Sequence, residues 1–530
     1  MRAPAPLAAV LALALAAPAL AGDDAEVRGR ALLHLRLTDV RNLPDGEVLF
    51  DPTTRSFAVQ NYLGPGPSES YASSVVSAGL DGSAFSDRLR FALTADTGEV
   101  RRMRFPRTAY ACRSDLSPTG LDLAGSPGCM GALRVPVPST LPGPAELTSN
   151  LRPIAEEAEA TLFVREAFVA VGLGRAAFAT LRAGRKRMVV GDGFVYDDYG
   201  LGVEADLDLG AIGPPLDVAL AAFYPPRDFP TGTGLRSPLL ALRVDVVPSL
   251  FEHAGIFAAF AHDETGSVPE LFRSASIESQ VMRLRGTAPG SPEYVAASRI
   301  LAATLGRRLE GSSNLAWAGT SGHLLLGGGH EASWTAALLA GRIHLLVPQV
   351  GLPPREVDVG ALGKLVSLRW RKALGAASVG GFFLWLSGDL PPEEKVRLGL
   401  SRDYRGFLGV APYVTATNLF FLGGVSESFA ARQATAPGVN ARGVIAPGLT
   451  ASWDPVTGLA LDAKGALLLA DEVGPFGGRV YGPEVDVSAT WAPASWISVV
   501  AEGDALWPVD FFDSRRTVTK LVLGVNLVTP

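Results

Sequence analysis

The sequence predicts an all-β fold, a single antiparallel transmembrane β-barrel of about 18 strands (16–20) with long extracellular loops and short periplasmic turns. Many segments alternate apolar and polar side chains: in residues 200–209, Leu201 and Val203 point one way and Glu204 points the other. Connections between such segments are short and long in turn. Hydrophobic residues make up 48% of the chain and the mean hydropathy is +0.23, yet no run of about 18 apolar residues follows the N-terminus, which excludes spanning helices. The alternative is a soluble β-protein that buries its apolar strand faces in a core.

The N-terminus has the pattern of a signal peptide. Arg2 supplies a positive charge, residues 7–17 form a short apolar core, and Ala19-Leu20-Ala21 is a small-residue cleavage site. An N-terminal membrane anchor is the alternative, which the short apolar core disfavours. We therefore expect residues 1–21 to be the signal peptide and residues 22–530 to form the barrel.

The expected strands follow one another with the alternation of a sheet that has one apolar face. Tryptophans near strand ends, Trp453, Trp491, Trp496 and Trp507, suit the aromatic girdles of a membrane barrel. The parse gives roughly 20 strands, and an even number such as 18 is expected. The expected strands are residues 29–40, 71–80, 85–96, 161–174, 176–188, 200–209, 216–224, 239–247, 254–263, 313–326, 331–346, 361–372, 377–388, 394–404, 407–419, 443–455, 459–471, 483–492, 497–507 and 517–528.

Two stretches between strands are rich in turn-forming residues and lack strand periodicity. One runs from the first expected strand to about Glu69, and the other covers residues 97–160. The second contains the two cysteines of the chain, Cys112 and Cys129, and we expect them to form a disulfide in an oxidising compartment that pins a large surface loop. A metal pair is less favoured because no His or Cys partners lie at ligand spacing.

A helix is expected inside a second long insert, residues 264–312. Ser291-Pro292-Glu293 is a helix start, with an N-cap serine, proline at the first helical position and an acid in the first turn. Tyr294, Ala297, Leu301 and Leu305 then share one face. We expect this face to pack on the barrel, in the lumen or over the outer mouth. A mobile loop helix without effect on transport is the alternative.

Three short segments resemble the early strands of the alginate-export family of outer-membrane barrels: Arg165–Val169 (REAFV), Leu181–Lys186 (LRAGRK) and Gly191–Gly193 (GDG). In that family a strand with an REAY-like start precedes a GRQ-like strand and a glycine-rich loop. Phe168 and Lys186 depart from the family, which favours Tyr and Gln there. The resemblance implies a monomeric barrel with polar side chains lining a pore, and it names no substrate.

Adjacent Arg165 and Glu166 cannot both face the lumen of a regular strand, so a β-bulge or a position near the rim is expected there.

Charged side chains on the polar strand faces are expected to line a lumen. The middle of the chain would supply a basic wall and the late strands an acidic wall, and the resulting transverse field would favour polar solutes. The alternative is that these charges pair and fill the interior. The expected pore-lining residues are Arg182, Lys186, Glu204, Asp206, Asp208, Arg342, Arg369, Arg371, Lys395, Arg397, Asp454, Glu484, Asp486, Glu502 and Asp504.

Signals for catalysis and metal binding are weak. Residues 319–323 do not form a nucleophile elbow, and His330-Glu331 lacks the second histidine of a zinc motif. Asp197-Asp198 has too few further oxygen ligands nearby in sequence for Ca²⁺, so a solvated loop is favoured. We expect no enzyme activity, cofactor or metal, and the net charge of −6 gives no sign of nucleic-acid binding.

The function expected from these features is an outer-membrane channel for small polar or charged solutes. The alternative is a barrel plugged by its own loops, with a structural or polysaccharide-export role that needs partners. The expected surroundings are outer-membrane lipid and the solutes themselves, and a monomer is favoured.

Overall fold

The computed structural model describes most of the chain. The expected signal peptide, Cys112 and Cys129 lie outside the described residues, so their assignments stay predictions. The described residues are 25–42, 44–51, 56–65, 69–85, 88–97, 99–102, 133–137, 154–156, 163–174, 178–211, 213–225, 238–249, 251–264, 273–305, 310–349, 352–390, 395, 403–410, 414–421 and 438–529.

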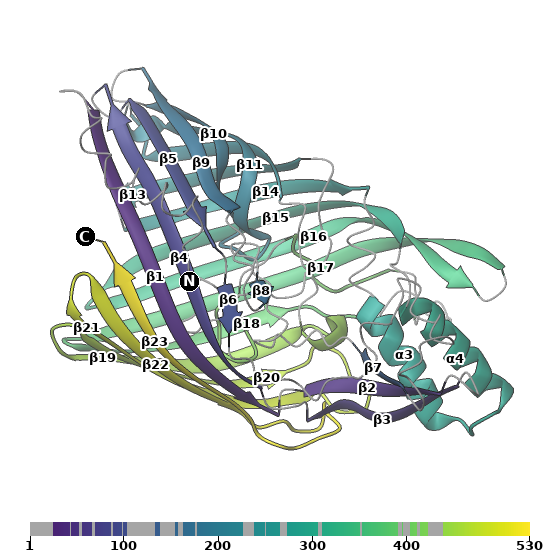
Figure 1. Ribbon diagram of the computed structural model, residues 1–530. Coiled ribbons are helices and arrows are strands. Elements are labelled where there is room, and N and C mark those ends of the chain that lie inside the picture. The colour runs from purple at the N-terminus through teal and green to yellow at the C-terminus, as the bar shows by residue number, and fades with distance from the viewer. Residues whose placement is uncertain are drawn as a thin grey trace.

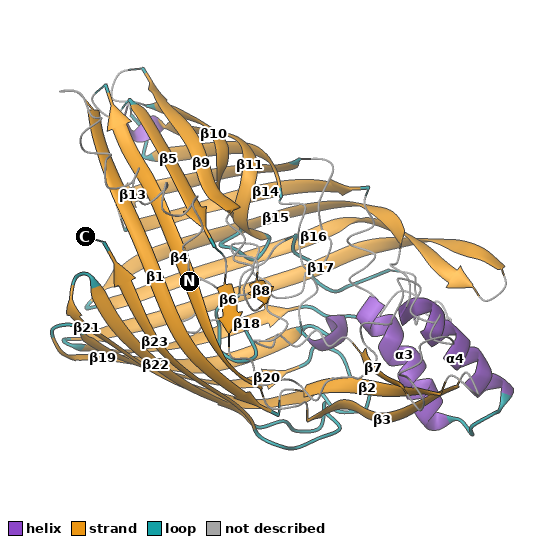
Figure 2. Cartoon of the chain, viewed as in Figure 1, coloured by secondary structure: helices purple, strands orange, loops and turns teal. Residues whose placement is uncertain are grey.

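Eighteen antiparallel strands form a closed barrel (Figures 1 and 2). Each pairs with its neighbours along the chain, and β1 pairs with β23 on one side and β4 on the other, which closes the sheet. The short β6 (Glu99–Arg102) and β8 (Ile154–Glu156) join the same sheet and pair with each other in parallel. The barrel strands are β1 (Ala25–Arg41), β4 (Glu69–Ala84), β5 (Leu89–Asp96), β9 (Phe163–Leu173), β10 (Ala179–Val190), β11 (Tyr196–Asp208), β12 (Leu216–Tyr224), β13 (Leu239–Ser249), β14 (Glu252–Asp263), β15 (Glu310–Gly327), β16 (His330–Gln349), β17 (Leu352–Leu374), β18 (Ala377–Leu386), β19 (Val444–Val456), β20 (Leu459–Leu469), β21 (Val480–Ala494), β22 (Ile497–Leu506) and β23 (Val518–Val528).

The two ends of the barrel differ in their connections. At one end, called here the short-turn end, β17 is joined to β18 through residues 375–376 and β19 to β20 through residues 457–458. At the other, the long-loop end, residues 264–309 separate β14 from β15 and residues 387–443 separate β18 from β19. This is the expected order of short and long connections.

One expected strand, residues 407–419, is wrong, and most of another, residues 394–404, lies outside the described residues. In the described parts of this stretch, the chain makes one isolated bridge, Tyr404 beside Ala361, and otherwise runs without strand pairing. Phe407, Leu408, Leu419 and other apolar side chains are buried there. The apolar residues that suggested strands therefore pack in the interior.

Two stretches read as loops contain strands. Residues 41–70 include β2 (Pro44–Asp51) and β3 (Ser56–Pro65), and residues 97–160 include β6, β7 (Leu133–Val137) and β8. β2, β3 and β7 form a separate three-stranded sheet. The expectation of loops without strands is therefore corrected. β2 and β3 form a local hairpin, whereas the pairings of β2 with β7 and of β6 with β8 join segments far apart in sequence, which local periodicity does not report.

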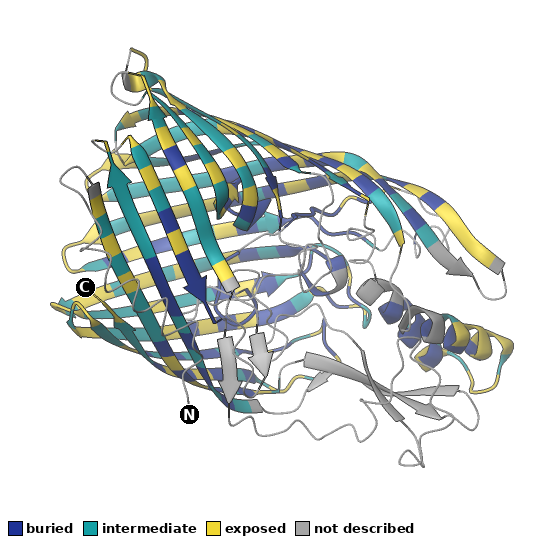
Figure 3. Ribbon diagram, turned by 45° about the horizontal axis from the view of Figure 1, so that its top comes forward, coloured by how far each residue is buried: buried dark blue, intermediate teal, exposed yellow. Residues whose placement is uncertain are grey.

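The outward face of the barrel is apolar and the inward face is mostly polar or small. On β11, Leu201, Val203 and Leu207 are exposed while Glu204 and Asp206, which alternate with them, turn inward, and the same alternation follows the other strands (Figure 3). Trp453, Trp491 and Trp496 are exposed near the short-turn end, and Trp507 is exposed just after β22 at the long-loop end. An exposed apolar wall with aromatic residues near both rims is the surface expected against lipid.

A β-bulge lies in β9 at the adjacent charged residues Arg165 and Glu166. The register between β5 and β9 shifts between Thr94 and Ala95, so that Arg165 has no partner of its own across the pair. Arg165 reaches Asp96 at 3.3 Å, and Glu166 reaches Arg30 at 3.1 Å. The bulge therefore lets both neighbouring charges find counter-ions, as the sequence predicted.

A helical hairpin lies at the long-loop end, where Figure 1 shows α3 (Arg273–Gly286) and α4 (Pro292–Leu305). The expected helix is α4, and its N-cap forms, because Ser291 Oγ accepts a hydrogen bond from Tyr294 N at 3.1 Å. Ala297 and Leu301 are fully buried in an apolar core that also includes Leu339 of β16.

Sequence reasoning missed α3, although Ile277, Val281 and Leu284 have helical spacing and all three are buried.

Candidate functional site

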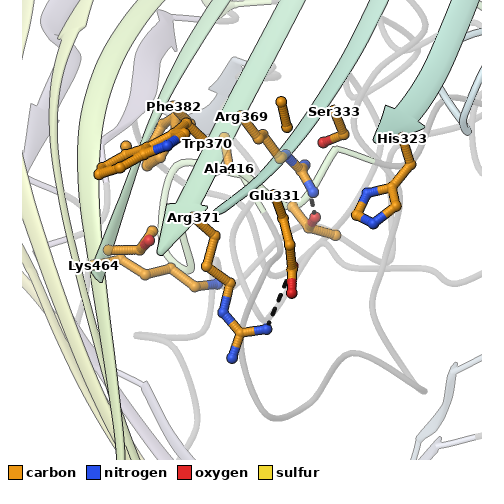
Figure 4. A pocket seen from close by; sticks show the side chains of 13 residues that line it. His323, Glu331, Ser333, Arg369, Trp370, Arg371, Phe382, Ala416 and Lys464 are labelled. Atoms are coloured by element: carbon orange, nitrogen blue, oxygen red, sulfur yellow. Dashed lines mark hydrogen bonds and ion pairs between the residues drawn. The ribbon is translucent and has the colours of Figure 1, made fainter. Parts of the chain in front are cut away.

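A polar cavity of about 390 Å³ lies inside the barrel, against the wall formed by β15 to β20 (Figure 4). Residues from a distant part of the chain, Thr415 and Ala416, complete its lining. Its ionisable side chains among the described residues are His323, Glu331, Arg369, Arg371 and Lys464.

Strand alternation positions the cations of this cavity. On β17, Arg369 and Arg371 point inward and alternate with Leu368 and Trp370, which are exposed on the outward face. The residue opposite Arg371 on β18 is Gly380, which has no side chain to fill the space beside the guanidinium. Arg371 Nε donates a hydrogen bond to Ser378 Oγ at 2.9 Å, which orients the side chain along the wall.

Cations dominate the electrostatics of the cavity. Glu331 is the one carboxylate among the described residues that line it, and it lies 3.7 Å from Arg371, a loose ion pair. Arg369 donates to Thr415 Oγ1 at 3.5 Å, and both contacts are drawn in Figure 4. A site with three cations and one acid, partly exposed to solvent, attracts anions.

The acidic residues of the late strands are buried instead of lining an open lumen. Glu484 and Asp486 of β21 and Glu502 and Asp504 of β22 point inward, but all four are at most 4% exposed. The segment 414–421 donates hydrogen bonds to the carboxylates of Glu484, Asp486 and Asp504. The expectation that they form an open acidic wall is therefore corrected.

Asn418 is the centre of this contact. Its backbone N–H donates to Asp486 Oδ2 at 2.9 Å and its side-chain Nδ2 donates to Asp504 Oδ1 at 3.2 Å. The next two backbone N–H groups, of Leu419 and Phe420, donate to Glu484 at 2.7 and 3.1 Å. Carboxylates that accept backbone N–H groups fix a chain segment strongly, so these acids hold the segment 414–421 against the inner wall.

Two lysines contact this cluster, and Lys520 forms ion pairs with two of its acids. Lys520 Nζ of β23 lies 2.7 Å from Glu502 and 2.9 Å from Asp504, and it also donates to Asn418 O at 2.9 Å. Lys464 Nζ donates to Asn418 Oδ1 at 3.1 Å. Lys464 thus connects the covered acids to the open cationic cavity.

On the first half of the barrel, the expected charges also point inward, and they pair. Lys186 contacts Glu204, and Arg182 contacts Asp206 and lies 3.7 Å from Glu204. Here the structure favours the alternative that neighbouring strands place opposite charges together.

Asp208 and Asp454 are exposed at the short-turn ends of β11 and β19, at the rim.

Two basic residues do not lie where the sequence placed them. Arg342 is exposed on the outward face of β16, in line with Leu338, because the inward positions there are Leu339, Gly341 and Ile343. Lys395 is buried outside any strand, where its ammonium contacts Asp389 and donates to Asp403 O at 2.5 Å. Both expectations of lumen exposure are corrected. Arg397 lies outside the described residues.

Several site residues were missed by sequence reasoning. Lys464 could have been found, because it alternates with the outward residues Ala463 and Gly465 in an expected strand. Lys520 and Glu331 also lie in expected strands. Asn418 gave no usable signal, because it lies in a segment that was read as a strand.

The described residues contain no cluster of metal-ligating side chains. Within the same part of the chain, no helix has the length and apolar character to cross a membrane.

No family model and no curated protein matches the chain. Among solved structures, it is similar to OccAB1 of Acinetobacter baumannii, with 8% identity over 95% of this chain and 97% of that one and a TM-score of 0.48. It is also similar to a BenF-like porin from Pseudomonas fluorescens Pf-5 (9% identity, 94% and 98% covered, TM-score 0.46) and to OccK11 (OpdR) of Pseudomonas aeruginosa (11% identity, 95% and 96% covered, TM-score 0.43). The resemblance to the alginate-export family gains no support from these comparisons.

Proposed function

We propose that the protein is a bacterial outer-membrane channel that passes small polar or charged solutes through a monomeric barrel. The observation that carries the proposal is the cationic cavity inside a closed barrel whose outward face is apolar. A closed barrel leaves no unpaired strand edge in lipid, and its inward polar groups solvate a passage. Arg369, Arg371 and Lys464 bias that passage towards anions.

Reconstitution of the purified full-length protein in planar bilayers tests this function. We expect discrete conductance steps and, under a salt gradient, a zero-current potential whose sign shows anion preference. Folded protein that inserts but conducts no ions would contradict the proposal. That result would favour the alternative, a barrel closed by its own inserts with an export role that needs partners.

The helical hairpin is expected to narrow the passage at the long-loop end. Glu278 of α3 forms a buried ion pair with Arg442 at 2.6 Å, and Arg285 binds Asp513 at 2.9 Å, so the hairpin is tied to two other loops. Deleting Ser274–Gly306 with Arg442→Met, which avoids an unpaired buried cation, should raise single-channel conductance while the barrel still folds.

The control for this deletion is Glu278→Gln with Arg442→Met, which removes the ion pair and keeps the hairpin. We expect its conductance to stay close to that of the unmodified protein. If the folded deletion conducts like the unmodified protein, the hairpin does not narrow the passage.

A further inference from the structure

A second cavity, of about 520 Å³, opens on the outer wall of the barrel near the long-loop end. It lies where β18 ends at Leu386 while β17 continues beyond it. Beside the free edge of β17, Leu362 N donates to Tyr404 O at 2.8 Å and Tyr404 N donates to Gly360 O at 2.6 Å. The segment around Tyr404 therefore extends the wall and forms one side of the cavity.

Two basic side chains from these neighbouring segments share the cavity. Tyr404 is fully buried, so Arg405 beside it points to the opposite, outward side, where it is exposed. Lys364 is exposed on the outward face of β17, between Leu362 and Val366 on the same face. Both line the cavity.

The cavity lies where the outer wall changes from apolar to polar. Leu362 and, across the strand pair from Lys364, Leu338 are 50% and 56% exposed. Further towards the long-loop end, the outward side chains are polar, with His344 bonded to Asp358 at 2.9 Å. On a membrane barrel this change marks the level of the lipid headgroups.

Only some of the charged side chains that line the second cavity have hydrogen-bond or ion-pair partners within the described part of the protein. Asp471 at the cavity accepts hydrogen bonds from Trp385 Nε1 at 3.1 Å and from Gly388 N at 2.9 Å, so its carboxylate is engaged. The ammonium of Lys364 and the guanidinium of Arg405 form no ion pair within the described part of the chain. Asp403 and Glu472 also line the cavity, and they would favour a headgroup that carries a cationic group or cation beside its phosphate.

We propose that this cavity binds the phosphorylated headgroup of a membrane lipid on the long-loop side. Lys364 and Arg405 contact the phosphate, and the acyl chains continue over the apolar wall at Leu362 and Leu338. The stem of Lys364 lies in the apolar part of the wall while its ammonium reaches the headgroup, the usual behaviour of lysine at a membrane interface. The inference rests on the proposed membrane location and is independent of conduction through the lumen.

Native mass spectrometry of the full-length protein in detergent tests the site. The probes are phosphatidic acid and diacylglycerol with the same acyl chains, so that the two lipids differ only in the phosphate. We expect phosphatidic acid to be retained in preference to diacylglycerol. Lys364→Gln with Arg405→Gln should weaken retention at least about tenfold, because a lost charge-assisted hydrogen bond typically costs more than the 1.4 kcal/mol of a tenfold change.

Lys372→Gln is the matched control, because Lys372 lies on the outward face of the same strand at its short-turn end. This variant should retain phosphatidic acid as the unmodified protein does. Equal retention by the double variant, or equal retention of diacylglycerol, would overturn the proposal. Displacement of the lipid by millimolar inorganic phosphate would also overturn it, because the site would then belong to free phosphate. Conductance measured in parallel separates failure of this site from failure of the channel function.

Discussion

Replacing Arg369, Arg371 and Lys464 together by glutamate is expected to reverse the ion selectivity of the channel from anions to cations. Among the described residues that line the cavity, these three cations are accompanied by a single carboxylate, that of Glu331. After the change, the same part of the lining holds four carboxylates and no lysine or arginine. Charges at a narrow, partly desolvated passage act on permeating ions with little screening, so the zero-current potential under a salt gradient should change sign.

The matched control carries the same change of charge outside the lumen. Arg342 of β16 and Lys364 and Lys372 of β17 lie on the outward face of the same wall. Replacing these three by glutamate should leave the sign of the potential unchanged. An unchanged potential in the cavity variant would mean that conducted ions do not pass this cavity.

Replacing Lys520 by methionine is expected to destabilise the barrel by about 3–5 kcal/mol, the usual cost of removing one partner of a buried ion pair. The change leaves Glu502 and Asp504 buried without their cation and removes a donor to Asn418 O. Unfolding by guanidinium in detergent micelles, followed by tryptophan fluorescence, measures the loss.

Two further variants make the test specific. Glu502→Gln with Asp504→Asn in the Lys520→Met background removes the unmatched charges and should recover much of the lost stability. Lys372→Met, at a partly exposed lysine of β17, should change stability by less than about 0.5 kcal/mol. If Lys520→Met unfolds like the unmodified protein, Lys520 does not stabilise the cluster.

The alternation of apolar and polar side chains predicted the barrel and showed, for most strands, which side chains face outward and which face inward. Leu368 and Trp370 against Arg369 and Arg371 follow from a period of two, whatever the rest of the chain does. The bulge at Arg165 followed from the same rule, because two adjacent charges cannot face one side of a regular strand. Local signals also located α4, since an N-cap acts within one turn.

The sequence by itself thus determined which face of a strand is polar, and only the tertiary structure decided what that face meets. Glu484 points inward as its alternation requires, but it accepts its hydrogen bonds from a segment 65 residues earlier in the chain. That segment has the apolar composition of a strand, and it lies against the inner wall with its N–H groups on these carboxylates. Strand pairing likewise placed Arg182 beside Asp206. The face to which a strand side chain points is a local property of the backbone. Burial and charge pairing, in contrast, depend on contacts between distant parts of the chain.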